Sequence, residues 1–168
     1  GLFTQDVAGM QAAAAALCTD WRRVDHAARL PVLGVPDGPY LAQTEPEALA
    51  VFEEELLMLQ VAGCTVRRVS EFEDIDMLNQ LHRRLVFAEF AQEHAAWFAQ
   101  HESLYRPRTV EAIRLGQSVG ADELAQAKAH CLALRDELTK KMDKMGIDLW
   151  VCPAAVGPAP AGLEATGA

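Results

Sequence analysis

Residues 32–69 carry the pattern that most constrains the fold, because an apolar run, a helical period and a β-branched run follow one another closely. Residues 32–35 are apolar and lead directly into prolines and glycines, which is typical of a buried strand that enters a loop. Apolar side chains then recur at helical spacing between Pro46 and Gly63, and a β-branched segment follows at 64–69. The sequence therefore predicts two parallel strands joined by a right-handed helical crossover.

The rest of the chain reads as helices and one further strand. Asp6 is placed to act as an N-cap, and Gly146 is placed to end the last helix. The predicted fold is α/β in one domain over residues 1–168, with about three short strands in a mostly parallel sheet. The further elements are helices at 7–18, 75–98, 109–115 and 124–145, a strand at 147–151, and an irregular loop rich in Pro, Gly and Ala at 153–168.

Composition narrows the classes of partner. The chain has 168 residues, is 51% hydrophobic and carries a formal net charge of −9, with acids and bases interspersed. A phosphate-binding surface needs clustered cations, so nucleic acid is not an expected partner. No apolar run approaches the roughly 20 residues that span a bilayer, and no membrane association is expected. Four cysteines without C-x-x-C spacing favour reduced thiols packed in apolar surroundings and a cytoplasmic location.

Several segments, taken in order, resemble the amidase signature family of serine amidohydrolases. They are GLFTQDV at 1–7, LGVPDGPYL at 33–41, AGCTV at 62–66, LYRPRTVEA at 104–112 and the proline-rich stretch at 148–167. The resemblance spans nearly the whole chain and implies part of the amidase signature fold. It also implies hydrolysis of a carbon–nitrogen amide bond through an acyl-enzyme, with neither a metal nor an organic cofactor.

The family's catalytic residues have no counterpart in this chain. The family uses a Ser nucleophile, a second Ser on a cis peptide bond and a Lys base, which must lie within hydrogen-bond reach of one another. The only serines here are Ser70, Ser103 and Ser118, and the lysines begin at Lys128, none of them in the family's catalytic context. We therefore expect no catalytic residue, a post-nucleophile fragment that is inactive alone, and binding of a small-molecule amide only together with the missing catalytic portion.

An alternative is a non-catalytic module derived from an amidase, or a subunit that docks on a separate catalytic half. Both interpretations predict an apolar sheet edge or helix face that the missing portion would cover. If that surface is exposed, it favours self-association, so a homo-oligomer is one expected state.

Two loops are candidate binding elements. By resemblance, Pro153, Ala154 and Ala155 form part of a substrate-pocket wall, although Cys152, Ala154 and Ala155 stand where the family often has threonines. Independently of the resemblance, 38–40 follows the carboxyl end of a predicted strand, where ligands bind in open α/β sheets. A tight turn explains 38–40 equally well.

Two further motifs are better explained by local helix structure than by a catalytic serine or a metal site. The run at 116–120 fits G-x-S-x-G around Ser118, but it lies between two predicted helices, whereas a nucleophile elbow needs a strand-to-helix turn. A helix-to-helix turn is the expected structure. The second motif is a set of possible metal ligands on one predicted helix: Glu89, Glu93, His94 and His101. These residues lack the Glu-x-x-His spacing of a helical metal site, so we expect a solvated helix face and no bound metal.

Overall fold

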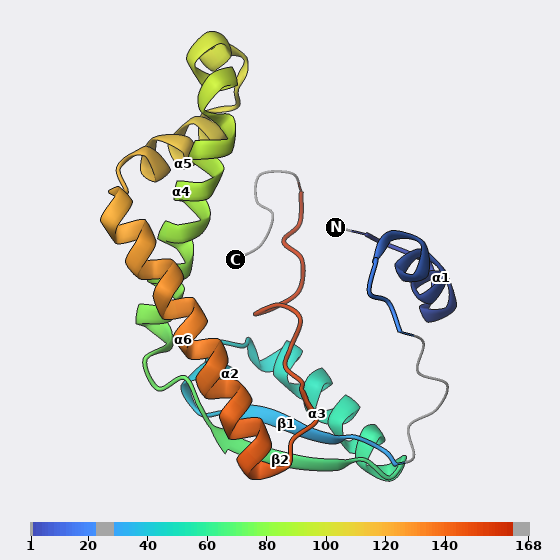
Figure 1. Cartoon of the computed structure of the whole chain (residues 1–168). Coiled ribbons are helices and arrows are strands. Elements are labelled where there is room, and N and C mark those ends of the chain that lie inside the picture. Colours follow the sequence, from blue (N-terminus) through green and yellow to red (C-terminus); the bar gives the residue numbers. More distant parts are fainter. Residues whose placement is uncertain (1, 23–28, 163–168) are drawn as a thin grey trace. The chain divides into compact units, whose positions relative to one another are not determined.

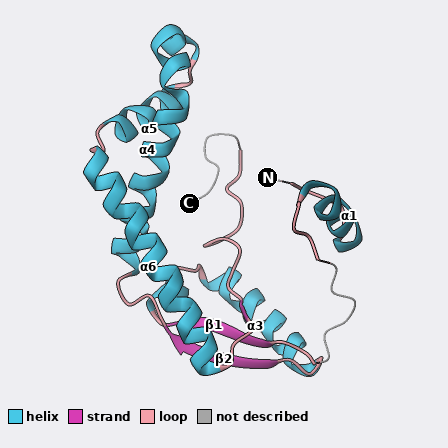
Figure 2. Ribbon diagram, in the orientation of Figure 1, coloured by secondary structure: helices cyan, strands magenta, loops and turns pink. Residues whose placement is uncertain are grey.

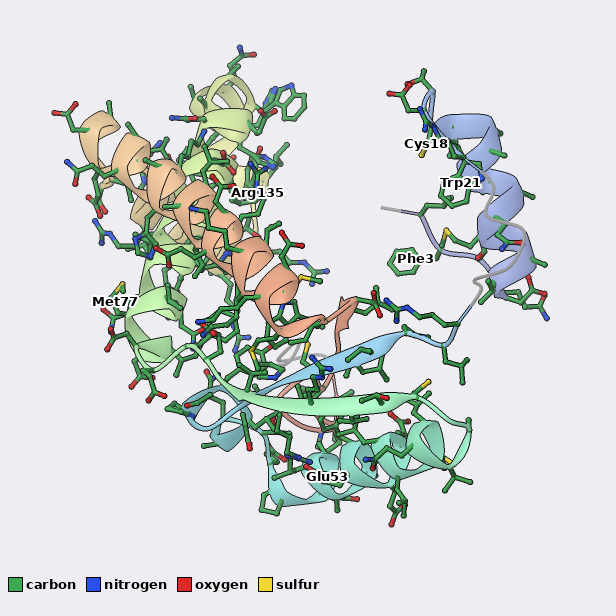
Figure 3. All side chains as sticks on the ribbon, turned by 60° about the horizontal axis from the view of Figure 1, so that its bottom comes forward. Phe3, Cys18, Trp21, Glu53, Met77 and Arg135 are labelled. Atoms are coloured by element: carbon green, nitrogen blue, oxygen red, sulfur yellow. The ribbon has the colours of Figure 1, made fainter. Side chains whose placement is uncertain are left out.

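The computed structural model describes residues 2–22 and 29–162. The chain divides into two compact units, residues 1–30 and 31–168, which are described separately below. The first unit contains helix α1 (Val7–Leu17). The Asp6 carboxylate accepts a hydrogen bond of 2.7 Å from the Gly9 amide, which confirms the predicted N-cap. In this unit the Phe3 ring is fully exposed (Figure 3).

The second unit is built on a parallel sheet of three strands (Figures 1 and 2). Strand β1 (Val32–Asp37) lies in the centre, between β2 (Thr65–Ser70) and β3 (Leu149–Trp150). Helix α3 (Pro46–Val61) connects β1 to β2. The predicted α/β fold with a parallel sheet is confirmed, and so is the strand–helix–strand unit.

The remaining helices include one that the sequence did not predict. Helix α2 (Pro39–Ala42) forms directly after β1, where a tight turn was one expectation. The other helices agree with the predicted ones and extend beyond them at one or both ends: α4 (Ile75–His101), α5 (Pro107–Gln117) and α6 (Ala121–Met145), with a 3₁₀ turn at Glu102–Leu104. No helix within the described ranges combines the length and apolar character needed to cross a bilayer.

Alternate residues of β1 serve opposite faces of the sheet, as the pleat requires. On one face, Val35 is completely buried and packs with Leu41, Phe52 and Leu56, so α2 and α3 close that side. On the other face Gly34 leaves no room for a side chain: a Cβ there would lie 2.9 Å from atoms of Ile147 and Trp150. Ile147, which follows α6, and Trp150 of β3 therefore press directly on the central strand.

Helices α4 and α5 form a second apolar cluster around Ala91, Phe98 and Ile113. The two backbones approach very closely at Gly116, where a Cβ would lie 1.9 Å from the carbonyl oxygen of Phe87. Helix α6 is tied to α4 by ion pairs between Lys128 and Glu89, at 2.8 Å, and between Arg84 and Glu123.

Strand β3 is shorter than the predicted strand at 147–151. Gly146 adopts a left-handed conformation (φ 59°), and the Ile147 amide donates a hydrogen bond of 2.9 Å to the carbonyl oxygen of Met142. Ile147 therefore completes the end of α6 rather than beginning the strand. The Ile147 side chain is buried against the sheet. Its apolar character therefore reflects this burial and not a position in the strand.

Candidate functional site

The strand order creates a reversal point between β1 and β3. From β1 the chain crosses through α3 to β2 on one side, whereas β3 joins β1 on the other side and is reached through α6. In open α/β sheets, the connections after two such strands diverge and leave a crevice at their carboxyl ends, where ligands bind. The segments that meet there are α2 with its following residues and the loop after β3.

The loop after β3 is held against the start of α3. The Glu45 amide donates a hydrogen bond of 2.6 Å to the carbonyl oxygen of Val156. Gly157 lies so near the Glu45 side chain that a Cβ would be 2.4 Å from its carboxyl carbon. These contacts fix the position of residues 153–155, the loop predicted from its sequence to form a pocket wall.

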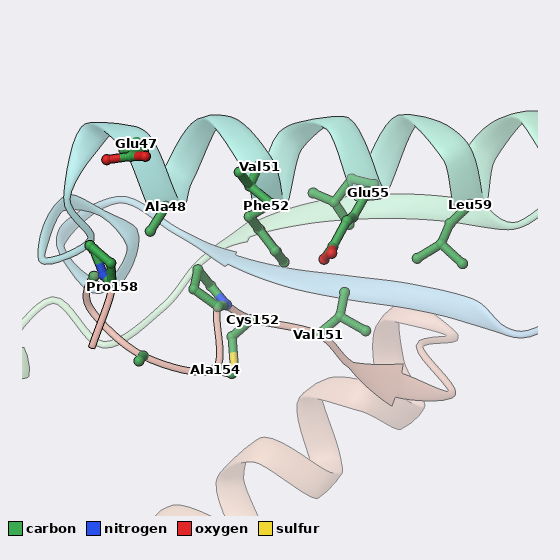
Figure 4. A pocket seen from close by; sticks show the side chains of 14 residues that line it. Glu47, Ala48, Val51, Phe52, Glu55, Leu59, Val151, Cys152, Ala154 and Pro158 are labelled. Carbon is green, nitrogen blue, oxygen red and sulfur yellow. The ribbon is translucent and has the colours of Figure 1, made fainter. Parts of the chain in front are cut away.

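On one side of this loop lies an apolar groove of about 560 Å³. Phe52, Glu55 and Leu59 point from α3 toward Val151 on the opposite wall (Figure 4). The two charged residues among those that line the groove are Glu47 and Glu55, both on α3. We call this space the apolar groove, and its remaining lining residues are Ala48, Val51, Leu56, Cys152, Pro153, Ala154, Ala155, Gly157 and Pro158.

On the other side of the loop lies a smaller space of about 250 Å³, which we call the polar hollow. Its lining side chains are those of Tyr40, Gln43, Thr44 and Asn79, together with loop residues 153–156. The Asn79 Nδ2 atom donates a hydrogen bond of 2.6 Å to Gln43 Oε1, and Gln43 Nε2 donates one of 3.1 Å to the carbonyl oxygen of Tyr40. None of the lining residues carries a charge.

Tyr40 joins the polar hollow to the loop after β3. A hydrogen bond between its hydroxyl and the Cys152 side chain, reinforced by partial burial, raises the pKa of Tyr40 to about 12. The phenol is therefore protonated at neutral pH.

The Tyr40 ring packs on Phe72, with 5.4 Å between the ring centroids. Phe72 has φ 60°, which costs a side-chain-bearing residue about 1–2 kcal/mol. Such strain persists only where the surroundings enforce it, and it clusters at functional sites.

The structure separates the predicted site residues into two groups. Pro153, Ala154 and Ala155 lie together at the reversal point and line both the apolar groove and the polar hollow. Ser118, in contrast, is the exposed C-cap of α5, and its hydroxyl donates a hydrogen bond of 2.7 Å to the carbonyl oxygen of Leu115. The G-x-S-x-G motif is therefore a helix-to-helix turn, as its position suggested.

Two of the four helix residues considered for a metal site, Glu89 and His94, have other contacts. Glu89 pairs with Lys128, and His94 Nδ1 lies 2.9 Å from the Tyr105 hydroxyl. Across 2–22 and 29–162, no group of three or more His, Cys, Asp or Glu side chains is arranged to hold a metal ion.

Of the serines, Ser70 lies nearest to the carboxyl edge. Its hydroxyl donates a hydrogen bond of 2.6 Å to Glu73 in the turn before α4, and it lines neither the apolar groove nor the polar hollow.

Sequence reasoning missed Gln43, Phe72 and Asn79. Gln43 follows the predicted turn and carries no motif of its own, and Asn79 lies on a helix more than thirty residues later. Only the sheet topology brings Asn79 beside Gln43. The one available signal was general: in a parallel sheet, polar residues that follow different strands meet at the carboxyl edge.

Comparison with known proteins gives a structural relationship. No family model and no curated protein matches the chain. The chain is similar to the crystal structure of an amidase, with a TM-score of 0.68 and 28% sequence identity. The similarity covers 83% of this chain and 31% of the amidase chain, so this chain spans less than a third of that protein's length. The fold of the chain is therefore α/β and amidase-like.

Proposed function

We propose that this chain forms part of the substrate-binding wall of an amide hydrolase of the amidase signature type. The observation that carries the proposal is the position of residues 153–155. This loop, selected by its resemblance to a family pocket wall, lies at the reversal point of the sheet and separates the apolar groove from the polar hollow. The similarity to a solved amidase supports the same function.

Amide hydrolysis through an acyl-enzyme needs a nucleophile and a base that activates it. The residues that line the two spaces include Cys152 and Thr44, but neither His nor Lys. The Cys152 side chain is hydrogen-bonded to Tyr40, which is not a base at neutral pH. We infer that the nucleophile and the base come from outside this chain. Its own residues then bind and orient the amide and exclude water from it.

The proposal is tested by comparing this chain with the longest protein that its reading frame encodes. We expect the longer protein to hydrolyse simple amides and to form a covalent adduct with a serine-directed fluorophosphonate, whereas residues 1–168 alone do neither. If the reading frame contains no further segment, or the longer protein shows no amide hydrolysis, the chain is instead a non-catalytic amidase-derived module.

A substitution in the loop tests the proposed role of the wall. Ala154→Trp places a large side chain beside both spaces, and we expect it to raise KM for amide hydrolysis by the longer protein by about tenfold or more, because the substrate loses room. Ala161→Trp is the matched control, since Ala161 lies in the same exposed tail and lines neither space. Equal KM values for the two variants would remove the loop from the substrate site.

A further inference from the structure

The turn that joins α4 to α5 presents apolar and cationic side chains together. They line a shallow depression of about 400 Å³, which we call the tip patch. Two of its apolar side chains face solvent, since Trp97 is 63% exposed and Leu104 is 80% exposed. Trp, Tyr and Arg are the residues that most often carry the binding energy at protein interfaces. All three types occur in the tip patch, which consists of Trp97, His101, Leu104, Tyr105 and Arg106.

Contacts on the inner side of the turn hold the tip patch in place. The Tyr105 ring packs edge-on against Phe98, with 5.4 Å between the ring centroids, and its hydroxyl lies 2.9 Å from His94 Nδ1. Glu102 accepts hydrogen bonds of 2.8 and 2.9 Å from Arg114 Nη2. The turn is therefore fixed to both helices before any partner arrives, which lowers the entropy lost on binding.

Arg106 gives the tip patch a positive charge. It forms no ion pair with any residue of 2–22 or 29–162, and none of the residues that line the patch is acidic. His101, which becomes cationic when it is protonated, lies in the same patch. A partner that fits this surface combines apolar side chains with carboxylates.

Helix α3 of the same chain has a surface of this kind. It carries four glutamates and neither Lys nor Arg. Phe52 and Leu56 of α3 are buried against the sheet, but apolar side chains also lie on the opposite side of the helix, where they are exposed. A helix that is apolar all round is normally covered on every side. We call this side the outer face of α3; its residues, spaced by three and four, are Glu54, Leu57, Met58 and Val61.

The tip patch and the outer face of α3 are too far apart to meet within one copy of the chain. Helix α3 packs on the sheet, whereas α4 leaves the sheet after β2 and has 27 residues. A helix of that length spans about 40 Å, and the tip patch lies at its far end (Figure 1). A contact between the two surfaces therefore requires two copies.

We propose that the tip patch of one copy binds the outer face of α3 of a second copy, with Arg106 facing Glu54. Two copies related by a twofold axis make this contact twice, so association stops at a dimer. Each copy carries a net charge of −9, but repulsion between distant charges is screened beyond about 8 Å at physiological salt. The contacting pairs then decide the outcome. This inference does not depend on amide hydrolysis.

The first experiment measures the mass of the chain of 168 residues in solution. In sedimentation velocity at increasing concentration, we expect it to approach twice the 18.3 kDa of one chain. Trp97→Ala should raise the dissociation constant by about thirtyfold or more, the effect of removing a central aromatic side chain from an interface. Trp21→Ala is the control, because Trp21 is also exposed but belongs to the first unit. It should leave the dissociation constant unchanged.

Charge reversal tests which surfaces meet. Arg106→Glu and Glu54→Arg should each raise the dissociation constant by about tenfold or more, because like charges then face each other in both contacts. Arg135→Glu changes the net charge as Arg106→Glu does, but lies on α6 outside both surfaces, and should have no effect. An equimolar mixture of the Arg106→Glu and Glu54→Arg variants should associate as the original chain does, since each tip patch then meets an α3 of opposite charge.

Four results would overturn the inference. They are a chain that stays monomeric throughout, equal effects of Arg106→Glu and Arg135→Glu, a mixture of the two reversed variants that fails to associate, and a mass that grows beyond two copies. Circular dichroism of every variant verifies that the fold is retained. The mixture gives the sharpest answer, because neither a folding defect nor a change in net charge is repaired by adding a second variant.

Discussion

At the scale of single residues, the side chains that line the polar hollow are neutral hydrogen-bonding groups. Tyr40 shows this best, because its phenol bonds to Cys152 and its ring packs on Phe72. The cysteines behave differently from the expectation that they pack in apolar surroundings. Cys18, Cys131 and Cys152 are exposed, and only Cys64 is half-buried. Apolar neighbours in sequence therefore did not indicate burial at these positions.

The raised pKa of Tyr40 predicts how the protein responds to alkali. Because folding favours the neutral phenol, this contribution to stability is complete below pH 10 and is lost as the pH rises toward 12. In a spectrophotometric titration of tyrosinate, the difference between the original chain and Tyr40→Phe should show a midpoint near pH 12. Cys152→Ala removes the main cause of the shift and should move that midpoint down toward pH 10. An unchanged midpoint would contradict the Tyr40–Cys152 hydrogen bond.

At the scale of helices and strands, local sequence signals predicted most of what the structure contains. The Asp6 N-cap, the Pro46 and Pro107 helix starts and the Gly146 helix end all lie where their backbone preferences require. Long-range contacts account for the differences. Ile147 reads as a strand residue because it is apolar, but it is buried at the end of α6.

Close helix contact at Gly116 yields a prediction with an internal control. Gly116→Ala places a Cβ against the backbone of α4 at Phe87, so the two helices must separate, and we expect a loss of about 1–3 kcal/mol or more in the free energy of unfolding. Gly120→Ala meets no atom within 4 Å and keeps an ordinary φ of −68°, so it loses only the preference for Gly over Ala at the N-cap of α6, about 0.5–1 kcal/mol. Urea unfolding of both variants measures the difference. Similar losses for the two would contradict the close contact.

At the scale of the whole molecule, the chain consists of two units with very different interiors. The sheet and both apolar clusters are made of residues from Val32 onward. Within the described part of the first unit, Ala14 is the one buried apolar side chain, and Val7 and Leu17 are largely exposed. The sequence predicts one domain over residues 1–168 from its length and hydrophobic content. The apolar period of helix 7–18 does not by itself reveal what that helix packs against.

This division predicts the effect of removing the first unit. A chain of residues 31–168 should keep a cooperative thermal transition, with a Tm within about 4 °C of the original, a difference that corresponds to about 1 kcal/mol for a protein of this size. Differential scanning calorimetry of the two chains makes the comparison. Loss of the transition would show that the second unit does not fold independently.

The loop at 153–155 has a consequence for how selectivity could change during evolution. It lines both the apolar groove and the polar hollow, and its position is fixed by the Glu45–Val156 hydrogen bond. A displacement of this loop enlarges one space only at the expense of the other, and a bulkier residue at 154 or 155 takes room from both. Under the proposed function, a substitution in this loop therefore changes the fit of a ligand in both spaces at once. Substitutions that change one space alone lie on the outer walls, which are α3 for the apolar groove, and α2, the residues after it and α4 for the polar hollow.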